Sequence, residues 1–125
     1  MSIEMDSTRI LAVDDEENFL ALLRRTLEKE GFEVNTALSG EEAVRLLEEG
    51  PFDLALIDIR MAPMDGFSLL EHIKRRNLDT KAIMITAYPS AQARLRSLQK
   101  KASAFLAKTV SLDELKRTIR QTLSK

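Results

Sequence analysis

Residues 10–15 read ILAVDD and residues 54–58 read LALID, so two short apolar runs each end in aspartate. Both runs are of strand length, and neither alternates between polar and apolar residues. Near-continuous apolar character is typical of strands that are buried on both faces, as they are in a parallel sheet. The two stretches therefore predict parallel strands that carry Asp14, Asp15 and Asp58 at their carboxyl ends.

Three further runs of strand length lie at residues 32–37, 82–86 and 104–107. Helical spacing of apolar residues follows each of the five runs and predicts five helices. The resulting strand–helix alternation predicts an α/β fold, a doubly wound five-stranded parallel sheet with five flanking helices. A sheet of this kind binds its ligand at the carboxyl ends of its strands.

Local signals place the helices. Ser39 with Glu42 and Ser111 with Glu114 are capping boxes that open the second and fifth helices. The first helix, with its apolar face formed by Phe19, Leu22, Leu23 and Leu27, ends at Gly31, and the third follows Asp65-Gly66. We expect Pro89 to start the fourth helix, with Leu95 and Leu98 as a weak apolar stripe, and Leu112, Leu115, Ile119 and Leu123 to share one face of the fifth.

Composition excludes several classes of protein. A chain of 125 residues has room for one domain, and the absence of cysteine excludes disulfides and cysteine-ligated metals. His72 is the single histidine, and we assign it no role. The net charge of -1 gives no overall attraction to nucleic acid or to an anionic membrane. No apolar run is long enough to span a bilayer and the first residues do not resemble a signal peptide, so we expect a cytoplasmic protein with no membrane partner.

Residues with charged or hydroxyl side chains lie at the ends of four predicted strands. They are Asp14 and Asp15 at the first, Asp58 at the third, Thr86 at the fourth and Lys108 at the fifth. Three carboxylates brought close together repel one another, and an all-oxygen cluster suits Mg²⁺. A lysine and a hydroxyl beside them would bind an anionic group. Together these residues supply the parts for phosphoryl transfer onto a carboxylate.

Each of these residues also has a plainer interpretation. Asp14 and Asp15 could cap the first helix, Asp58 could be a loop acid, Lys108 could be solvated, and Thr86 could be an ordinary strand residue. The functional interpretation rests on their occurring together at the ends of the first, third, fourth and fifth strands.

Five motifs carry a resemblance to a known family: LAVDDE at 11–16, LIDIRM at 56–61, MDG at 64–66, ITA at 85–87 and FLAK at 105–108. In this combination the chain resembles the receiver domain of two-component response regulators, over residues 9–123. The resemblance implies the flavodoxin-like strand order 2-1-3-4-5, with a tail at residues 1–8 and the receiver domain at 9–125.

The resemblance also implies residue roles. Asp58 would accept a phosphoryl group from a phosphohistidine of a sensor histidine kinase or phosphotransfer protein. Mg²⁺ would be held by Asp14, Asp15, Asp58 and the backbone carbonyl of Arg60. Such a protein catalyses only its own phosphorylation and dephosphorylation and is otherwise not an enzyme.

Further roles follow from the same resemblance. Lys108 and Thr86 would bind the phosphoryl oxygens, and Thr86 would move together with Phe105 as a switch. Arg60 and Tyr88, two positions beyond the acceptor and the threonine, would set how long the phosphoryl group persists, and both are bulky here. The switch would act through the face formed by the fourth helix, fifth strand and fifth helix on an output domain or partner, without direct binding of nucleic acid by this domain.

The chain departs from the family pattern in three places. Thr109 replaces the usual cis proline, and because a non-proline cis bond costs about 2.5–4 kcal/mol we predict a trans Lys108–Thr109 bond. Residues 61–64 read MAPM, with the proline displaced by one position. Residues 101–104 read KASA and lack an acid that many members use to dimerise through the fourth helix, fifth strand and fifth helix, so we do not expect that dimer.

Three other functions compete with a phosphoacceptor. A receiver-like scaffold would act only by protein–protein interaction. An aspartyl phosphatase would commonly carry a second acid where this chain has Arg60, and flavodoxin-like cofactor binding needs a phosphate loop where residues 14–17 are acidic. We interpret the basic residues of the fourth helix, Arg94, Arg96, Lys100 and Lys101, as a solvated face.

Overall fold

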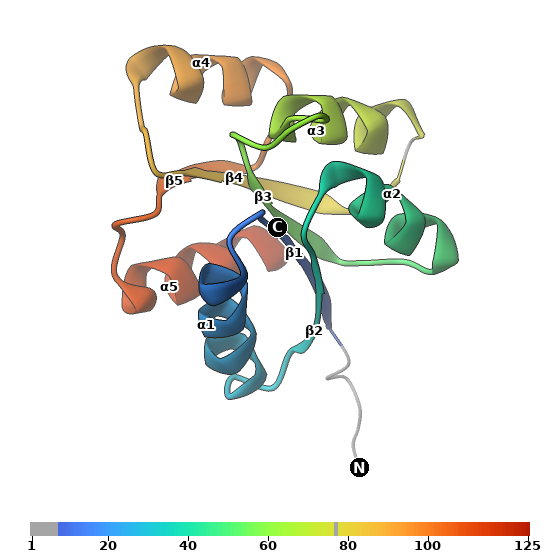
Figure 1. Cartoon of the computed structure of the whole chain (residues 1–125). Helices are drawn as coiled ribbons and strands as arrows, with labels where there is room; N and C mark the ends of the chain where they lie inside the picture. Colours follow the sequence, from blue (N-terminus) through green and yellow to red (C-terminus); the bar gives the residue numbers. More distant parts are fainter. Residues whose placement is uncertain (1–7, 77) are drawn as a thin grey trace.

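The computed structural model describes residues 8–76 and 78–125. Its five strands are all parallel and lie in the order β2-β1-β3-β4-β5, which confirms the predicted fold class (Figure 1). Apart from Thr8, the predicted tail at residues 1–8 lies outside the described residues. The strands are β1 (Arg9–Val13), β2 (Glu33–Ala37), β3 (Leu54–Asp58), β4 (Lys81–Thr86) and β5 (Ala104–Ala107).

Five helices cover the sheet in two layers (Figure 1). One layer contains α1 (Glu17–Glu28) and α5 (Leu112–Leu123), and the other contains α2 (Gly40–Glu49), α3 (Gly66–Arg75) and α4 (Ala91–Gln99). Successive strand residues pack into opposite layers, because side chains alternate across a strand. Ile10 and Leu54 pack toward the α1 and α5 layer, whereas Leu11 and Ala55 pack toward α2 and α3. Burial on both faces explains the apolar runs.

Side-chain caps start four of the helices. Ser39 and Ser111 each accept a hydrogen bond from the backbone N–H three residues later, at 3.1 Å, which confirms both as caps, although Glu42 accepts from the N–H of Leu38 and not from that of Ser39. Asp65 caps α3 in the same way at 2.8 Å, and Ser90 caps α4 at 3.0 Å. The prediction that Pro89 starts the fourth helix was wrong by two residues, because the Ser90 hydroxyl provides the cap and Ala91 is the first helical residue.

The predicted apolar stripe of the fourth helix was also wrong. Leu95 and Leu98 are 57% and 51% exposed, and the residue of α4 that is buried is Ser97. The Ser97 hydroxyl donates to the carbonyl of Ala93 at 2.8 Å, so its polar group is satisfied within the helix. On α5, Leu115 and Ile119 are buried as predicted, but Leu112 in the first turn is 40% exposed.

The backbone bears out the prediction about Thr109. Within residues 8–76 and 78–125 the cis peptide bond is Ala62–Pro63, so Lys108–Thr109 is trans. In the same described part of the chain, no helix combines the length and the apolar character needed to cross a bilayer.

An acidic cluster at the carboxyl edge of the sheet

Three carboxylates meet at the carboxyl edge of the sheet. One oxygen from each of Asp14, Asp15 and Asp58 lies within 4.8 Å of the others. Asp14 and Asp58 are 1% and 3% exposed, whereas Asp15 faces solvent. The parallel strands β1 and β3 are hydrogen-bonded neighbours, so their ends bring residues 44 positions apart in the sequence together. The predicted convergence of the three acids is confirmed.

The loop after β1 positions Asp14. Its backbone N–H donates to the carbonyl of Ala37 at 3.1 Å, which extends the pairing of β1 with β2 by one residue. Its Oδ1 accepts a hydrogen bond from the N–H of Glu16 at 2.9 Å. Glu16 is the N-cap of α1 and makes no side-chain cap. Neither Asp14 nor Asp15 is therefore the N-cap of this helix, and that part of the plainer interpretation is wrong.

The loop after β3 folds back over Asp58. The N–H of Gly66 donates to the carbonyl of Ile59 at 2.9 Å, and a Cβ at Gly66 would lie 2.2 Å from the carbonyl oxygen of Asp58. No side chain fits in that space, so glycine is required at this position. The Oδ1 of Asp58 accepts from the N–H of Arg60 at 3.3 Å. Gly66 is part of the motif that carried the resemblance, but its contact with Asp58 could be seen only in three dimensions.

Lys108 binds the acids from the end of β5. Its Nζ lies 2.8 Å from Asp14 Oδ2, 2.8 Å from Glu16 Oε1 and 3.8 Å from Asp58 Oδ2. The Asp14 contact is an ion pair without the alignment of a hydrogen bond, and Asp14 Oδ2 has no hydrogen-bond partner among the described residues. The same Nζ lies 4.8 Å from the centre of the Phe19 ring. Asp14 and Glu16 are thus the partners closest to this lysine.

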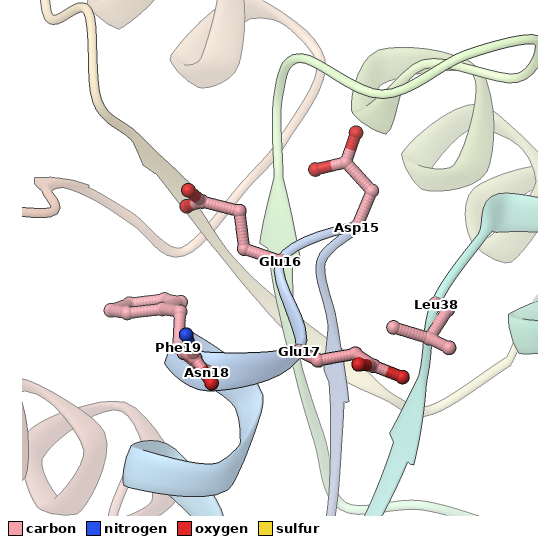
Figure 2. A pocket seen from close by; sticks show the side chains of 6 residues that line it. All are labelled: Asp15, Glu16, Glu17, Asn18, Phe19 and Leu38. Carbon is pink, nitrogen blue, oxygen red and sulfur yellow. The ribbon is translucent and has the colours of Figure 1, made fainter.

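Glu16 was not among the predicted site residues. In the sequence it is one acid in a like-charged run, and its partner Lys108 is 92 positions away. Figure 2 shows Asp15 and Glu16 leaving the β1–α1 loop in different directions, with Glu16 on the side of Phe19. Glu16 therefore lies beside the cluster and forms a second ion pair with Lys108, whereas Asp15 is one of the three converging carboxylates.

Burial and crowding change the acidity of the cluster. Burial, together with the charge of Asp14, raises the pKa of Asp58 to about 7, although Lys108 opposes the shift. Burial also raises the pKa of Asp14. Burial alone would lower the pKa of Lys108, but its pairing with Asp14 and Glu16 raises it instead. One ammonium group thus compensates only part of the negative charge, and a second cation would be stabilised here.

The donor set suits Mg²⁺. The three carboxylates offer only oxygen ligands, two of them come from buried side chains, and Asp15 is open to water. A hard cation that keeps some of its waters is bound by a site of this kind. Asp14, Asp15 and Asp58 could therefore hold the ion.

Thr86 and Phe105 lie on neighbouring strands. Thr86 ends β4, is buried, and its Oγ1 accepts from the N–H of Tyr88 at 3.0 Å. In the β4–β5 register, Thr86 is opposite Ala107 and Phe105 is opposite Met84. The two side chains thus project from the same face of the sheet as diagonal neighbours. Phe105 is partly exposed and packs against the core on the α2 and α3 side.

Two arginines lie on aromatic rings beside the cluster. The guanidinium of Arg60 lies 4.6 Å from the centre of the Tyr88 ring, and that of Arg96 lies 4.3 Å from the centre of the Phe67 ring. Both arginines line a hollow that also contains Thr86. The predicted pair of Arg60 and Tyr88 is therefore in direct contact at the edge of the site.

Comparisons with known proteins agree with this geometry. Residues 10–120 match the family model of the response regulator receiver domain. The chain is 35% identical over 119 residues to the transcriptional regulatory protein ZraR of Escherichia coli K12, covering 95% of this chain and 27% of ZraR. It is 34% identical over 111 residues to TcrA of Mycobacterium tuberculosis H37Rv, covering 89% of this chain and 44% of TcrA. The chain thus spans less than half the length of these relatives.

Solved structures give the same result. A CheY-like receiver domain protein from Methanospirillum hungatei superposes with a TM-score of 0.88 at 37% identity, over 94% of both chains. TrrA of Thermotoga maritima, solved in complex with Mg²⁺ and BeF, superposes with a TM-score of 0.83 at 36% identity, over 92% of this chain and 98% of TrrA. With the family match over most of its length and the acids at the predicted strand ends, this chain belongs to the family of response regulator receiver domains.

Proposed function

We propose that Asp58 accepts a phosphoryl group from a phosphohistidine of a sensor histidine kinase or phosphotransfer protein. The observation that supports this most strongly is the position of Asp58, buried at the end of β3 with Asp14 on one side and Lys108 Nζ 3.8 Å away. An Asp58 oxygen attacks phosphorus, the bond from phosphorus to the imidazole nitrogen breaks, and the nitrogen keeps that electron pair. The domain thereby catalyses its own phosphorylation and the later hydrolysis of the phosphoryl group, and it turns over no separate substrate.

The residues around Asp58 prepare it for this step. Burial raises the pKa of Asp58 to about 7, so part of the carboxyl is protonated at neutral pH, and positive charge from Lys108 and a bound cation favours the ionised form that attacks. Asp14, Asp15, Asp58 and the backbone carbonyl of Arg60 would hold Mg²⁺, which supplies positive charge against the phosphoryl oxygens. Lys108 and Thr86 each donate a hydrogen bond to those oxygens.

Movement of the Thr86 hydroxyl toward the phosphoryl group would change the β4–α4 loop. Thr86 Oγ1 now accepts from the N–H of Tyr88 at 3.0 Å, so a shift of this hydroxyl releases that backbone group. The Phe105 side chain, a diagonal neighbour on β5, follows into the space that Thr86 leaves. The altered α4, β5 and α5 face controls an output domain or partner protein in the cytoplasm, and the domain itself does not contact nucleic acid.

The stacked pair of Arg60 and Tyr88 shields the phosphoryl group. Its position at the edge of the hollow that contains Thr86 limits the approach of water to the phosphorus atom. We expect no dimer through α4, β5 and α5, because residues 101–104 lack the acid that many family members use for it.

The test is the intact mass of the protein after incubation with phosphoramidate, with Mg²⁺ or with EDTA. We expect a single phosphoryl adduct that requires both Mg²⁺ and Asp58, absent in Asp58→Ala and retained in Asp79→Asn, which changes an exposed acid elsewhere. If folded wild-type protein forms no adduct, the domain is a scaffold that acts by protein–protein interaction. An adduct that persists in Asp58→Ala would also refute the assignment.

A further inference from the structure

Two helices of this fold end in the same hydrogen-bonding pattern but with different residues. At the end of α1, the N–H of Gly31 donates to Glu28 and the N–H of the next residue donates to Leu27, both across the last turn. At the end of α4, Lys101 and the residue after it donate to Leu98 and Ser97 at 3.0 Å in the same way. Each motif contains one residue with a left-handed backbone, with φ of 95° at Gly31 and 71° at Lys101.

Lysine is an unfavourable choice for this position. In the left-handed region the Cβ of an ordinary residue crowds the following backbone, and glycine avoids the clash. Within the described residues, Lys101 is the only non-glycine residue with a positive φ. Gly31 shows that this fold uses glycine where only the turn is needed. The lysine side chain therefore needs an explanation of its own.

Lys101 borders a hollow between α3 and α4 whose lining residues are mostly basic. This α3–α4 hollow is lined by Glu71, Lys74, Arg75, Lys100 and Lys101, and its volume is about 460 Å³. Lys100 pairs with Glu71, the single acid in the lining. Lys74, Arg75 and Lys101 have no carboxylate oxygen within 4.0 Å in the described part of the chain. Three cations that form no salt bridge among the described residues thus border one shallow depression.

Helix dipoles account for only part of this charge. Lys74 and Arg75 lie in the last turn of α3 and Lys100 caps α4, where cations are favourable. Lys101 lies beyond the end of its helix, in a conformation that opposes its presence. We propose that the α3–α4 hollow docks a short acidic segment of a partner protein, whose carboxylates pair with Lys74, Arg75 and Lys101.

The surroundings favour a short acidic peptide over other anions. The hollow is bordered by helix carboxyl ends, which repel any anion. Binding there needs several ion pairs at once, and a peptide with several carboxylates can supply them. A long polyanion would extend beyond the hollow toward Glu48 of the neighbouring α2, which pairs with Arg76. The aliphatic stems of the lysines offer an apolar surface to the side chains between the carboxylates.

The location separates this surface from the phosphorylation site. α3 starts at Gly66, against the carbonyl of Asp58, and runs away from the carboxyl edge of the sheet. The hollow therefore lies toward the opposite end of α3, and we expect docking to require no phosphoryl group on Asp58.

The test is binding of a fluorescein-labelled oligoglutamate peptide to the full chain, followed by fluorescence anisotropy at low salt. We expect Lys101→Gly to weaken binding about 3–5-fold, which is the scale of one surface ion pair. The same change raises the melting temperature by about 2–4 °C, because glycine suits the left-handed turn. Gain of stability with loss of binding is a signature that general damage to the fold cannot produce.

Matched variants complete the test. Lys101→Arg retains the charge and is expected to bind as wild type does, and Arg117→Gln removes an exposed cation from α5 and leaves binding unchanged. Equal loss in Lys101→Gly and Arg117→Gln, or no loss in either, overturns the proposal. Stronger binding of a duplex DNA oligonucleotide, lost in Lys101→Gly, would assign the hollow to nucleic acid and also overturn it. Phosphoramidate labelling of Lys101→Gly stays normal in every case, so the two proposals fail independently.

Discussion

The Nζ of Lys108 lies 2.8 Å from Oδ2 of Asp14, an acid that is 1% exposed and has no hydrogen-bond partner at that oxygen within the described residues. The ion pair joins the end of β5 to the end of β1, two strands that are not neighbours in the sheet. In the absence of a metal ion, the lysine is thus the main compensation for a buried negative charge.

Removing that compensation is expected to destabilise the fold in a pH-dependent way. In Lys108→Met the free energy of unfolding should fall by about 3 kcal/mol at pH 8, because Asp14 becomes an unpaired buried charge. The loss should shrink toward pH 5, since the already raised pKa of Asp14 rises further and the acid takes up a proton. Urea denaturation in EDTA at the two pH values measures both effects.

The control for this change is Lys116→Met. Lys116 lies 3.5 Å from Glu30 with both side chains 24% exposed, so a smaller loss is expected. Equal losses in Lys108→Met at pH 5 and pH 8 would contradict the role assigned to the buried acid.

Replacing the acceptor is expected to stabilise the protein at high pH. The pKa of Asp58 is about 7 in the fold against 3.8 in a free side chain, so the unfolded state releases the proton first as pH rises. The folded state therefore loses stability relative to the unfolded state between about pH 4 and 7, and the penalty is complete above pH 7. Asp58→Asn should raise the free energy of unfolding by as much as about 4 kcal/mol at pH 8 in EDTA, because the penalty is about 1.4 kcal/mol for each pH unit between the two pKa values.

The same variant should give almost no gain at pH 4, where Asp58 is largely protonated in the folded state. Mg²⁺ should reduce the gain at pH 8 by stabilising the wild-type acids. Thermal denaturation across the pH range checks both points, and a gain independent of pH would show that ionisation of Asp58 is not its cause.

Gly66→Ala is expected to disrupt the site through the backbone. Its Cβ would lie 2.2 Å from the carbonyl oxygen of Asp58 and 2.8 Å from the Cα of Ile59, and neither atom can move alone. We expect a loss of about 3 kcal/mol in the free energy of unfolding and slower labelling of Asp58 by phosphoramidate. In Gly50→Ala the nearest atom is the Nη1 of Arg9 at 3.2 Å, the end of a flexible side chain, so this variant should lose much less. Similar losses in the two variants would contradict the assigned contact.

The stacked pair Arg60 and Tyr88 is expected to slow hydrolysis of the phosphoryl group. Because the two groups are 4.6 Å apart and act as one unit, Arg60→Ala, Tyr88→Ala and the double variant should each speed hydrolysis by a similar factor, about 2–5-fold. Decay of the phosphoryl adduct by intact mass after removal of the donor measures the rates. Multiplicative effects would show that the two side chains act separately, and unchanged rates would exclude shielding.

How far the sequence predicts this structure depends on the range of the interactions. The strands and capped helices follow from local patterns, so the sequence assigns the acids Asp14 and Asp58 to one edge of the sheet. The pairing of Glu16 with Lys108 across 92 positions has no local signal. The clearance at Gly66 likewise exists only once the loop has folded back.

In the fourth helix a local pattern is present but predicts the wrong buried face. Leu95 and Leu98 have the spacing of a buried stripe, yet both are exposed, while Ala93 packs against the core and Ser97 is buried. Small residues let this short helix lie close to the sheet, and the internal hydrogen bond of Ser97 removes the cost of burying a hydroxyl. Apolar spacing alone does not distinguish that face from the exposed leucines.

The order of the strands makes β2 and β5 the two edge strands of the sheet. Strands with free backbone groups can recruit a strand from another molecule and begin aggregation. Here β2 carries Glu33 and Asn35, and β5 is only four residues long before Lys108. We therefore expect concentrated solutions of this domain to resist growth of the sheet from one molecule into the next.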